Sequence, residues 1–333
     1  MRKEKKQLLK IIDEFLHKSV AVWGDFILDE YLYGTTRRIS REAPVLILSY
    51  RSKEFALGGG GNSLLNLKAL GAHPVPVGVI GTDEAGKRIL RLLNRMNVST
   101  DYVLTEKTYS TPIKTRILAG EESTRKQQIL RIDKEARVPE TKELKRKLLN
   151  NIQKAYQRVD ALLISDYNYF TVKEDLFRKI LPRLRKSKKP VALDSRFRAT
   201  DFKGVTVLTP NEPEVEHALH IKLDNEDERV RKAGRQLLSR TEADAVLITR
   251  GSKGMVLFER QRPAFEIPIY GSTDIVDVTG AGDTVISVFT LALASGASFK
   301  QAASLANYAG GVVVMKKGTA TLSSQELKEA VVF

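Results

Sequence analysis

The strongest chemical signal in the chain is a short glycine-rich run that ends in a carboxylate. Residues 277–284 read Asp-Val-Thr-Gly-Ala-Gly-Asp-Thr and precede an apolar stretch. The glycines allow a tight turn whose backbone N–H groups open a helix, and such a helix start attracts an anion, for example a phosphate. Asp283 would lie in the first turn, where a carboxylate also caps helices. A cap alone does not need Gly-Ala-Gly before it, so a functional carboxylate is the favoured interpretation.

Residues 58–62 form a second glycine-rich run, Gly-Gly-Gly-Gly-Asn, before leucines at helical spacing. Four consecutive glycines cost backbone entropy, which indicates close approach of a ligand or of another backbone segment. The run lacks the G-x-G-x-x-G spacing of dinucleotide sites, and a plain linker remains an alternative.

Two carboxylates follow the first apolar run of the chain. Asp25 and Asp29 are four residues apart and come directly after residues 20–23. Ionised carboxylates accept strong hydrogen bonds, so the pair could hold vicinal hydroxyl groups. Each could equally be a turn residue or a cap.

Two further turns carry groups suited to a nucleotide and its metal. In Thr-Pro-Asn-Glu-Pro-Glu, residues 209–214, Asn211 and Glu214 fall on one side of a starting helix. They could organise Mg²⁺ through its waters, and a capping arrangement is the alternative. Thr-Arg-Gly-Ser-Lys-Gly, residues 249–254, ends a strand with two glycines and two cations. This turn suits a nucleotide phosphate or a hairpin.

The elements that must position these residues alternate between strands and helices. Short β-branched runs recur with helical stretches between them, at residues 20–23, 75–80, 161–164, 190–193, 205–208 and 245–249. This alternation predicts a mostly parallel sheet covered by helices on both faces. Ligands of such sheets bind beyond the carboxyl ends of the strands, where the polar turns lie. Residues 31–50 and 110–133 break the alternation and predict β ribbons that could form a small accessory sheet.

Composition limits the possible classes of protein. The 333 residues are 42% hydrophobic, and no apolar run approaches the roughly 20 residues of a membrane-spanning helix. The charged start, residues 1–10, lacks the apolar stretch of a signal peptide. We therefore expect a soluble, cytoplasmic protein with no membrane partner. The absence of cysteine excludes disulfides and thiol chemistry.

The net charge of +15 raises the question of nucleic-acid binding. The basic residues are scattered along predicted helices and interleaved with acids rather than aromatics. This distribution favours a solvated surface with a bias toward small anionic substrates, and we expect no nucleic-acid partner. Of the four histidines, only His217 and His220 have a metal-ligand spacing, which a solvated helix face also explains.

In their joint order these motifs make the chain resemble the ribokinase-like carbohydrate kinases. The family signature D-x-x-G-A-G-D is matched by residues 277–283, and the N-x-x-E element by residues 211–214. The pattern G-G-x-x-x-N-x-A-x-x-x-x-x-L-G is partly matched by residues 58–71. Within the family the chain is most similar to the bacterial D-glycero-D-manno-heptose 7-phosphate kinases, from about residue 20 to 330. No His-x-Gly-His nucleotidyl-transfer motif is present, so we expect kinase activity alone.

The resemblance implies a three-layer α/β sandwich with a mostly parallel central sheet and a small β lid. One kinase domain is expected over residues 1–333, with the ribbons at 31–50 and 110–133 as the lid. In the family this lid closes over the sugar and often helps to form a homodimer. ATP and Mg²⁺ are the expected cofactors, and a sugar phosphate is the expected small-molecule partner.

The resemblance also implies roles for individual residues. Asp283 matches the catalytic base, and Gly280, Ala281 and Gly282 match the anion hole beside it. Substrate contacts are expected at Asp25, Asp29, Gly58, Gly59, Asn62 and Asp166. Nucleotide contacts are expected at Asp194, Arg196, Asn211, Glu214, Thr249, Gly251, Gly254 and Asn307, with Glu214 reaching Mg²⁺ through water. Candidates for the substrate's existing phosphate are Lys114, Arg116 and Arg131, since a guanidinium binds phosphate in a bidentate fork.

Three departures from the heptose kinases bear on the acceptor. Gly60 and Gly61 stand where alanines are usual, Ser195-Arg196 replaces a common Pro-Lys pair, and Tyr169-Phe170 replaces a Lys-Gly pair. Arg196 can substitute for one lost lysine. The expected reaction is phosphoryl transfer from ATP to the anomeric hydroxyl of the heptose 7-phosphate. The alternative acceptors are another sugar, another sugar phosphate or a nucleoside, and a non-catalytic sugar sensor would give the Gly-Ala-Gly-Asp run no role.

Overall fold

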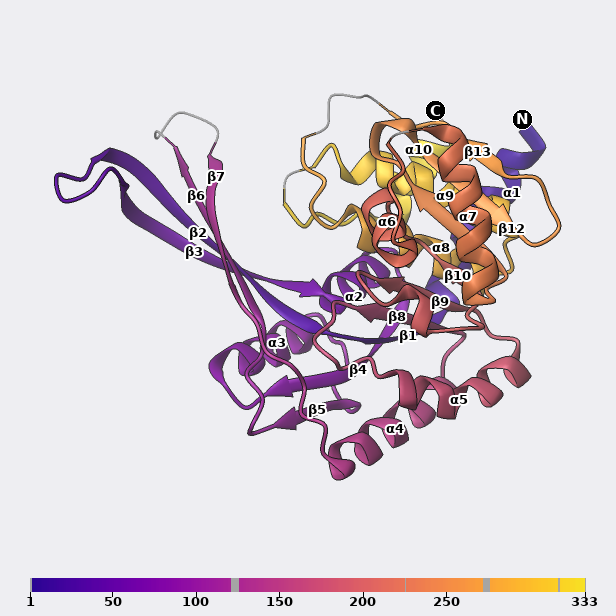
Figure 1. The fold of residues 1–333 in the computed structure, drawn as a ribbon, viewed down its shortest axis with the longest axis horizontal. Coiled ribbons are helices and arrows are strands. Elements are labelled where there is room, and N and C mark those ends of the chain that lie inside the picture. Colours follow the sequence, from indigo (N-terminus) through magenta and orange to yellow (C-terminus); the bar gives the residue numbers. More distant parts are fainter. Residues whose placement is uncertain (1, 121–125, 225, 272–275, 317, 333) are drawn as a thin grey trace.

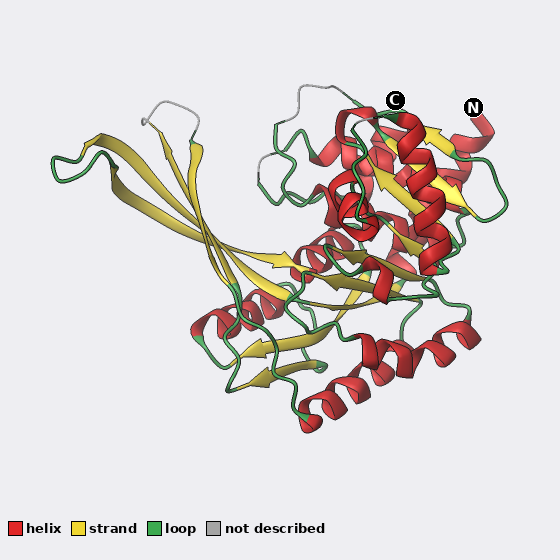
Figure 2. Ribbon diagram, in the orientation of Figure 1, coloured by secondary structure: helices red, strands yellow, loops and turns green. Residues whose placement is uncertain are grey.

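The computed structural model describes residues 2–120, 126–224, 226–271, 276–316 and 318–332. These residues form a nine-stranded central sheet between layers of helices, and a separate four-stranded sheet that projects from this body (Figure 1 and Figure 2). The three-layer α/β sandwich and the small second sheet predicted from the sequence are confirmed.

The central sheet is parallel except at one edge. Its order is β13-β12-β11-β10-β9-β8-β1-β4-β5. The strands are β1 (Ser19–Gly24), β4 (His73–Gly81), β5 (Val103–Glu106), β8 (Ala161–Asp166), β9 (Val191–Ser195), β10 (Val207–Leu208), β11 (Ala245–Thr249), β12 (Met255–Glu259) and β13 (Phe265–Ile267). All neighbours from β11 to β5 pair in parallel, whereas β12 pairs antiparallel with β11 and β13.

The six β-branched runs of the sequence correspond to strands β1, β4, β8, β9, β10 and β11. Strand β10 is shorter than its run, because it pairs only at Val207 and Leu208. The sequence analysis did not predict β5, β12 and β13. Residues 249–254 join β11 to the antiparallel β12, so the hairpin interpretation of this turn is confirmed.

Two hydrophobic cores lie on the two faces of the central sheet. Alternate residues of β1 separate them, since Val20 and Val22 enter the first core while Ala21 and Trp23 enter the second. The helices of the first core are α1 (Arg2–Asp13), α2 (Gly60–Ala69), α3 (Glu84–Arg95), α8 (Ala281–Ala294), α9 (Phe299–Val313) and α10 (Ser324–Val332). Those of the second are α4 (Lys142–Gln157), α5 (Glu174–Ser187), α6 (Glu212–Leu219) and α7 (Asp227–Thr241). None of the helices in the described ranges combines the length and apolarity needed to cross a bilayer.

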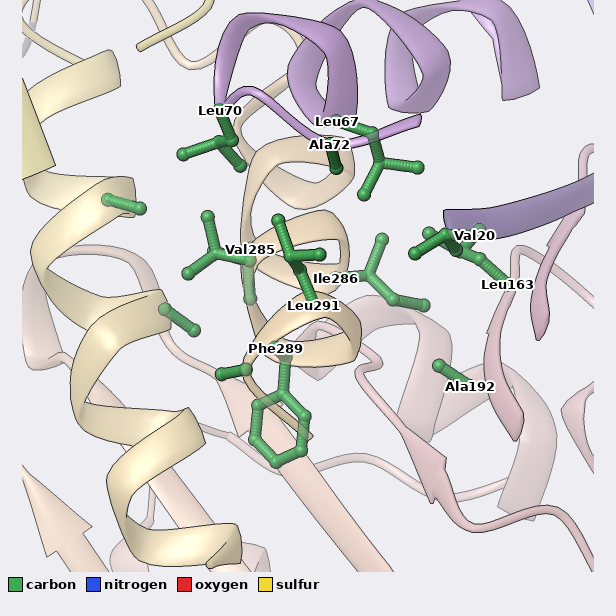
Figure 3. Close-up of a cluster of buried hydrophobic side chains, with 14 of the residues drawn as sticks. Val20, Leu67, Leu70, Ala72, Leu163, Ala192, Val285, Ile286, Phe289 and Leu291 are labelled. Atoms are coloured by element: carbon green, nitrogen blue, oxygen red, sulfur yellow. The ribbon is translucent and has the colours of Figure 1, made fainter. Parts of the chain in front are cut away.

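Helix α8 is buried along most of its length at the centre of the first core. Figure 3 shows Val285, Ile286 and Phe289 of α8 in one apolar cluster with Leu67 of α2 and Leu163 of β8. A helix that is apolar on all sides needs such complete coverage. The Thr284 hydroxyl also donates to Asn66 Oδ1 at 2.8 Å, which fixes the start of α8 against α2. This contact brings together the two glycine-rich runs of the sequence.

The small sheet has the order β3-β2-β6-β7. Its strands are β2 (Phe26–Ile39), β3 (Leu46–Gly59), β6 (Ile113–Gly120) and β7 (Gln127–Lys134). Strand β2 pairs antiparallel with β3 and parallel with β6, and β7 pairs antiparallel with β6. The predicted ribbons are confirmed as β structure, although the first is longer than residues 31–50. Residues 121–125 of the second ribbon lie outside the described residues.

Candidate active site

Two adjoining cavities open at the carboxyl ends of the parallel strands. The first has a volume of about 320 Å³ and the second about 490 Å³. Of the residues singled out from the sequence, the first cavity is lined by Asp29, Gly58, Gly59, Asn62, Lys114, Arg116, Asp194, Arg196, Asn211, Glu214, Thr249, Gly280, Gly282 and Asp283. The second is lined by Asn211, Thr249, Gly251, Gly254, Ala281, Gly282 and Asn307. Asn211, Thr249 and Gly282 line both cavities, so two bound ligands would meet beside the start of α8.

Asp283 lies in the first turn of α8 and lines the first cavity. Asn62 Nδ2 donates to Asp283 Oδ2 at 2.8 Å, and the Tyr167 hydroxyl donates to Oδ1 at 3.1 Å. Gly280 precedes the helix with a φ of 80°, and a Cβ there would lie 2.5 Å from Asn62 Nδ2. Glycine at 280 therefore permits both the turn and the contact between Asn62 and Asp283.

Burial raises the pKa of Asp283 to about 6, because the ionised carboxylate loses hydration there. The hydrogen bond from Asn62, the charge of Arg196 and the hydrogen bond from Tyr167 limit this rise. The negative charge of Asp29 adds to it. Asp283 is therefore mostly ionised at neutral pH, yet its pKa is close enough to neutrality for proton exchange with a substrate.

The second glycine-rich run lies against the carboxylates that follow β1. A Cβ at Gly58 would lie 2.7 Å from Asp29 Oδ2, and one at Gly59 would lie 2.6 Å from the backbone oxygen of Asp25. The close approach predicted from this run is thus confirmed. Asn62 follows in α2, and its Oδ1 is buried without a hydrogen-bond partner among the described residues. The first cavity therefore has an unused acceptor beside Asp283.

Three cations line the first cavity, and their charges are balanced differently. Arg116 Nη1 forms an ion pair with Asp29 Oδ1 at 2.8 Å. Lys114 and Arg196 form no ion pair within the described part of the chain. Burial and the charge of Arg196 lower the pKa of Lys114. Burial also opposes the ionisation of Arg196, but Tyr167 and nearby carboxylates raise its pKa above the ordinary value. Lys114 and Arg196 are thus the cations available to an anionic ligand.

Asn211 and Glu214 form a reciprocal cap at the start of α6. Asn211 Oδ1 accepts from the Glu214 N–H at 2.9 Å, and Glu214 Oε2 accepts from the Asn211 N–H at 3.0 Å. The capping alternative raised by the sequence is therefore confirmed. Both residues also line the first cavity, so the cap orients them toward a ligand as well.

The groups around Glu214 suit a hydrated divalent cation. Burial raises the pKa of Glu214 and, with the charge of Glu214, raises that of Asp194 well above its ordinary range. The buried Thr209 hydroxyl, which lines the same cavity, has no partner among the described residues. Mg²⁺ commonly binds one or two carboxylates together with waters and substrate phosphates. Two mutually repelling carboxylates and an unsatisfied hydroxyl fit that pattern.

The described residues of this site do not form a metal site from protein side chains alone. Across the described ranges, no group of three or more His, Cys, Asp or Glu is arranged to hold a metal ion. The rings of His217 and His220 lie 6.3 Å apart at the end of α6, and neither residue lines the two cavities.

Three of the substrate contacts expected from the sequence lie outside both cavities. The Asp25 carboxylate accepts backbone N–H groups of the loop after β8, and burial and the charge of Asp166 raise its pKa to about 6. Asp166 accepts from Ser195 and pairs with Arg198. Arg131 is half exposed and pairs with Asp133 at 2.9 Å. The contacts of Asp25 and Asp166 anchor the loop, and a substrate role for these three residues stays a prediction.

Sequence reasoning assigned no function to Tyr167, Thr209 or Thr319, all of which line the first cavity. Tyr167 and Thr209 each follow the carboxyl end of a parallel strand directly. That position was the available signal, because it is where ligands of such sheets bind.

The family model described as "pfkB family carbohydrate kinase" matches residues 17–326. The chain belongs to this family. The match covers both glycine-rich runs and every residue named above as lining the two cavities. The carbohydrate kinase class predicted from the sequence is confirmed.

Among curated relatives, this pfkB-family chain is 36% identical over 331 residues to the bifunctional protein HldE of Pelobacter propionicus, a match that covers 98% of the chain and 66% of that relative. It is 39% identical over 321 residues to the bifunctional protein HldE of Haemophilus influenzae, covering 96% and 64%. The chain therefore spans about two thirds of the length of these relatives.

Solved structures of low sequence identity share the fold. Arabidopsis thaliana ribokinase complexed with ribose and ATP aligns with a TM-score of 0.71 at 20% identity, covering 95% of this chain and 99% of that one. Escherichia coli phosphofructokinase-2 in complex with fructose-6-phosphate aligns with a TM-score of 0.73 at 18% identity, covering 95% and 98%. The ribokinase-like fold is therefore confirmed.

The buried charge of Asp283 should have a cost in stability that depends on pH. The fold raises its pKa from 3.8 to about 6, so in this window the folded state keeps a proton that the unfolded state releases. Stability therefore falls as the pH rises across the window. Between about pH 4 and pH 7, we expect wild type to lose up to about 3 kcal/mol more than Asp283→Asn, as measured by urea unfolding.

Asp277 offers a control for which the pH dependence of stability has the opposite sign. Burial opposes its ionisation, but N–H groups of Thr279 and Gly318 donate to it and lower its pKa. Asp277→Asn should therefore destabilise the protein at neutral pH and lose this effect as the pH falls below about 4. Identical pH profiles of stability for wild type and Asp283→Asn would contradict the account of the buried charge.

Proposed function

We propose that this kinase transfers the γ-phosphoryl group of ATP to the anomeric hydroxyl of D-glycero-D-manno-heptose 7-phosphate, which gives the 1,7-bisphosphate. The observation that carries the reaction type is the Asp283 carboxylate in the first cavity, next to Gly282, which lines both cavities. The acceptor is inferred from the resemblance of the motifs to heptose 7-phosphate kinases and from the relatives named HldE. Cytoplasmic location and independence of nucleic acid stay predictions.

Asp283 is the proposed general base. At neutral pH its ionised carboxylate would accept the proton of the acceptor hydroxyl as the oxygen attacks phosphorus. The bond from the γ-phosphorus to the bridging oxygen would break, and ADP would leave with that oxygen. The first turn of α8 supports this arrangement, because a Cβ at Gly282 would meet nothing within 4 Å and Gly282 lines both cavities. The first N–H groups of a helix lack partners within the helix. Such donors would stabilise the charge on the transferred group.

ATP is proposed to bind in the second cavity. This cavity lies between the turn after β11, with Thr249, Gly251 and Gly254, and Asn307 of α9. Asp194, Asn211 and Glu214, which all line the first cavity, would hold hydrated Mg²⁺. When bound, the metal ion neutralises phosphate charge.

The small sheet is proposed to act as the lid of a single kinase domain, 1–333, with lid segments at 31–50 and 110–133. Strands β2 and β6 contribute Asp29, Lys114 and Arg116 to the first cavity. Their side chains would contact the acceptor while the sheet excludes water, which limits hydrolysis of ATP.

Asp283→Asn tests the proposed base. The amide keeps the size of the side chain and cannot accept the proton, so we expect normal ATP binding and a loss of kcat by roughly 100- to 10,000-fold. Coupled ADP release measures turnover, and calorimetry measures ATP binding. Turnover close to that of wild type would remove Asp283 from the role of base.

The acceptor is tested by comparing kcat/KM for heptose 7-phosphate, unphosphorylated heptose, fructose 6-phosphate, ribose and a nucleoside. We expect heptose 7-phosphate to exceed every other acceptor. Lys114→Met should lower kcat/KM for heptose 7-phosphate by roughly 10- to 100-fold and affect unphosphorylated heptose little, because a charge-assisted hydrogen bond is lost.

Lys53→Met is a matched control for the lid lysine. Lys53 lies on β3 and pairs with Glu30 at 2.6 Å, away from the lining of the first cavity. Its removal should leave the acceptor ranking unchanged. A higher kcat/KM for another acceptor would replace the heptose assignment while leaving the kinase mechanism in place.

A homodimer is proposed to form through the lid. Leu130 and Ile132 of β7 are two residues apart, so they lie on one face of the strand, and they are 52% and 53% exposed. A second copy would cover this apolar face. Light scattering should give a dimer for wild type and a monomer for the double variant Leu130→Lys/Ile132→Lys. A wild-type monomer at micromolar concentration would exclude the proposed interface.

A further inference from the structure

Tyr167 makes a contact to Asp283 that the proposed mechanism does not yet use. Its hydroxyl lies 3.1 Å from Asp283 Oδ1 and 3.3 Å from Oδ2, and the side chain lines the first cavity. Asn62 Nδ2 donates to Oδ2 from the side of α2. The carboxylate is thus held between two donors from different elements, which fixes its rotation.

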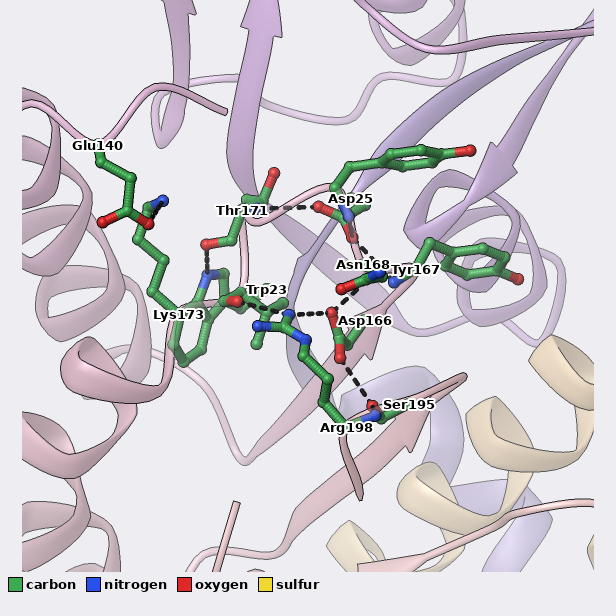
Figure 4. A network of polar contacts seen from close by, with 12 residues as sticks. Trp23, Asp25, Glu140, Asp166, Tyr167, Asn168, Thr171, Lys173, Ser195 and Arg198 are labelled. Carbon is green, nitrogen blue, oxygen red and sulfur yellow. Dashed lines mark hydrogen bonds and ion pairs between the residues drawn. The ribbon is translucent and has the colours of Figure 1, made fainter. Parts of the chain in front are cut away.

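The loop that carries Tyr167 is held in place from behind by buried polar groups. Figure 4 shows Asp25 and Asp166 among the groups bonded to this loop. The Asp25 carboxylate accepts the backbone N–H groups of Tyr167, Tyr169 and Thr171 at 2.8, 3.1 and 3.0 Å. Trp23 Nε1 donates to the backbone carbonyl oxygen of Thr171 at 3.1 Å. A loop fixed by this many buried bonds can hold an aromatic side chain in one orientation.

Two cationic side chains from different parts of the fold also lie near the ring of Tyr167. Lys114 Nζ, from strand β6 of the lid, lies 5.1 Å from the ring centroid. Arg196 Cζ, just after β9, lies 4.6 Å from it. Both cations lie within the range of cation–π attraction, and neither forms an ion pair with a carboxylate of the described residues. The ring therefore links the lid, the central sheet and the carboxylate of Asp283.

We propose that Tyr167 is a positioning residue for phosphoryl transfer. Its hydroxyl orients the Asp283 carboxylate toward the acceptor, and its ring places Lys114 and Arg196 where they meet an anionic acceptor. This inference rests on the proposed role of Asp283 as the base. In this role Tyr167 contacts the proposed base, Asp283, and does not contact the reacting atoms.

The hydroxyl has a consequence for the ionisation of Asp283 that can be measured. A hydrogen bond donated to the ionised carboxylate favours that form, so its loss should raise the pKa of Asp283. Burial raises the pKa of Tyr167 itself, which keeps the hydroxyl protonated as a donor. The other charged groups that line the cavity around Asp283 are Asp29 of β2, Lys114 and Arg116 of β6, Asp194 of β9, Arg196 and Glu214. All of them remain in Tyr167→Phe, so a shift would report on the hydroxyl.

Tyr167→Phe removes the hydroxyl and keeps the ring. We expect the acidic limb of kcat/KM against pH to move to higher pH by about one unit, with kcat at the plateau about tenfold lower. The KM for heptose 7-phosphate should stay unchanged, because the ring still places the two cations. An acidic limb at the wild-type position would overturn the positioning role.

Tyr169→Phe is the matched control on the same loop. The Tyr169 hydroxyl donates to Glu135 at 3.1 Å, away from Asp283, and its backbone N–H keeps the bond to Asp25 in the variant. The pH profile should therefore match that of wild type. An equal shift in Tyr169→Phe would show that loosening of the loop, rather than the Tyr167 hydroxyl, moves the limb, and would contradict the inference.

Tyr167→Leu removes the ring as well. Compared with Tyr167→Phe, we expect about a tenfold higher KM for heptose 7-phosphate and little change for unphosphorylated heptose. Equal KM values in the two variants would reject the role of the ring. Asp283→Asn separates this inference from the proposed function, because activity in this variant would reject Asp283 as the base. An inactive Asp283→Asn together with an unshifted Tyr167→Phe rejects only the role of Tyr167.

Discussion

The site depends on a carboxylate that is buried before any substrate arrives. Helix α8 packs in the first core along most of its length, and this packing carries Asp283 in its first turn below the surface. A charge removed from water needs donors, which Asn62 of α2 and Tyr167 supply. The contact between α2 and α8 therefore both closes the core and keeps Asp283 largely ionised at neutral pH.

Both glycine-rich runs follow from this constraint. A side chain at Gly280 would push Asn62 away from Asp283, and one at Gly58 would displace Asp29 from the same cavity. The glycines thus let two helix starts and a strand end converge, and the space that remains between them is the first cavity. The buried carboxylates are compensated by nearby cations. Arg116 pairs with Asp29, and the charge of Arg196 lowers the pKa values of Asp194 and Asp283.

The sequence could predict what depends on local pattern. The parallel strands were found because they are apolar runs between helices, and the residues at the two glycine-rich runs converge because the carboxyl ends of those strands share one edge. The local sequence pattern does not predict the direction in which a side chain points. Asp25 and Asp29 have the spacing of a pair, yet Asp25 turns toward backbone N–H groups about 140 residues later in the chain, at 167, 169 and 171. No local pattern contains that partner. The position of Tyr167 directly after β8 marks it as a possible cavity residue, but it does not predict the contact of its hydroxyl with Asp283.

Asp25 also explains how the small sheet and Asp283 are connected. It is the single residue between β1, an interior strand of the main sheet, and β2, a strand of the small sheet. Its backbone oxygen accepts from Gly60 at the start of α2, while its carboxylate holds the loop that carries Tyr167. The end of β1, the start of β2, the helix of Asn62 and the loop of Tyr167 therefore meet at one buried residue. Displacement of this residue would disturb both donors to Asp283 together, so Asp25 acts on the site from behind the cavity.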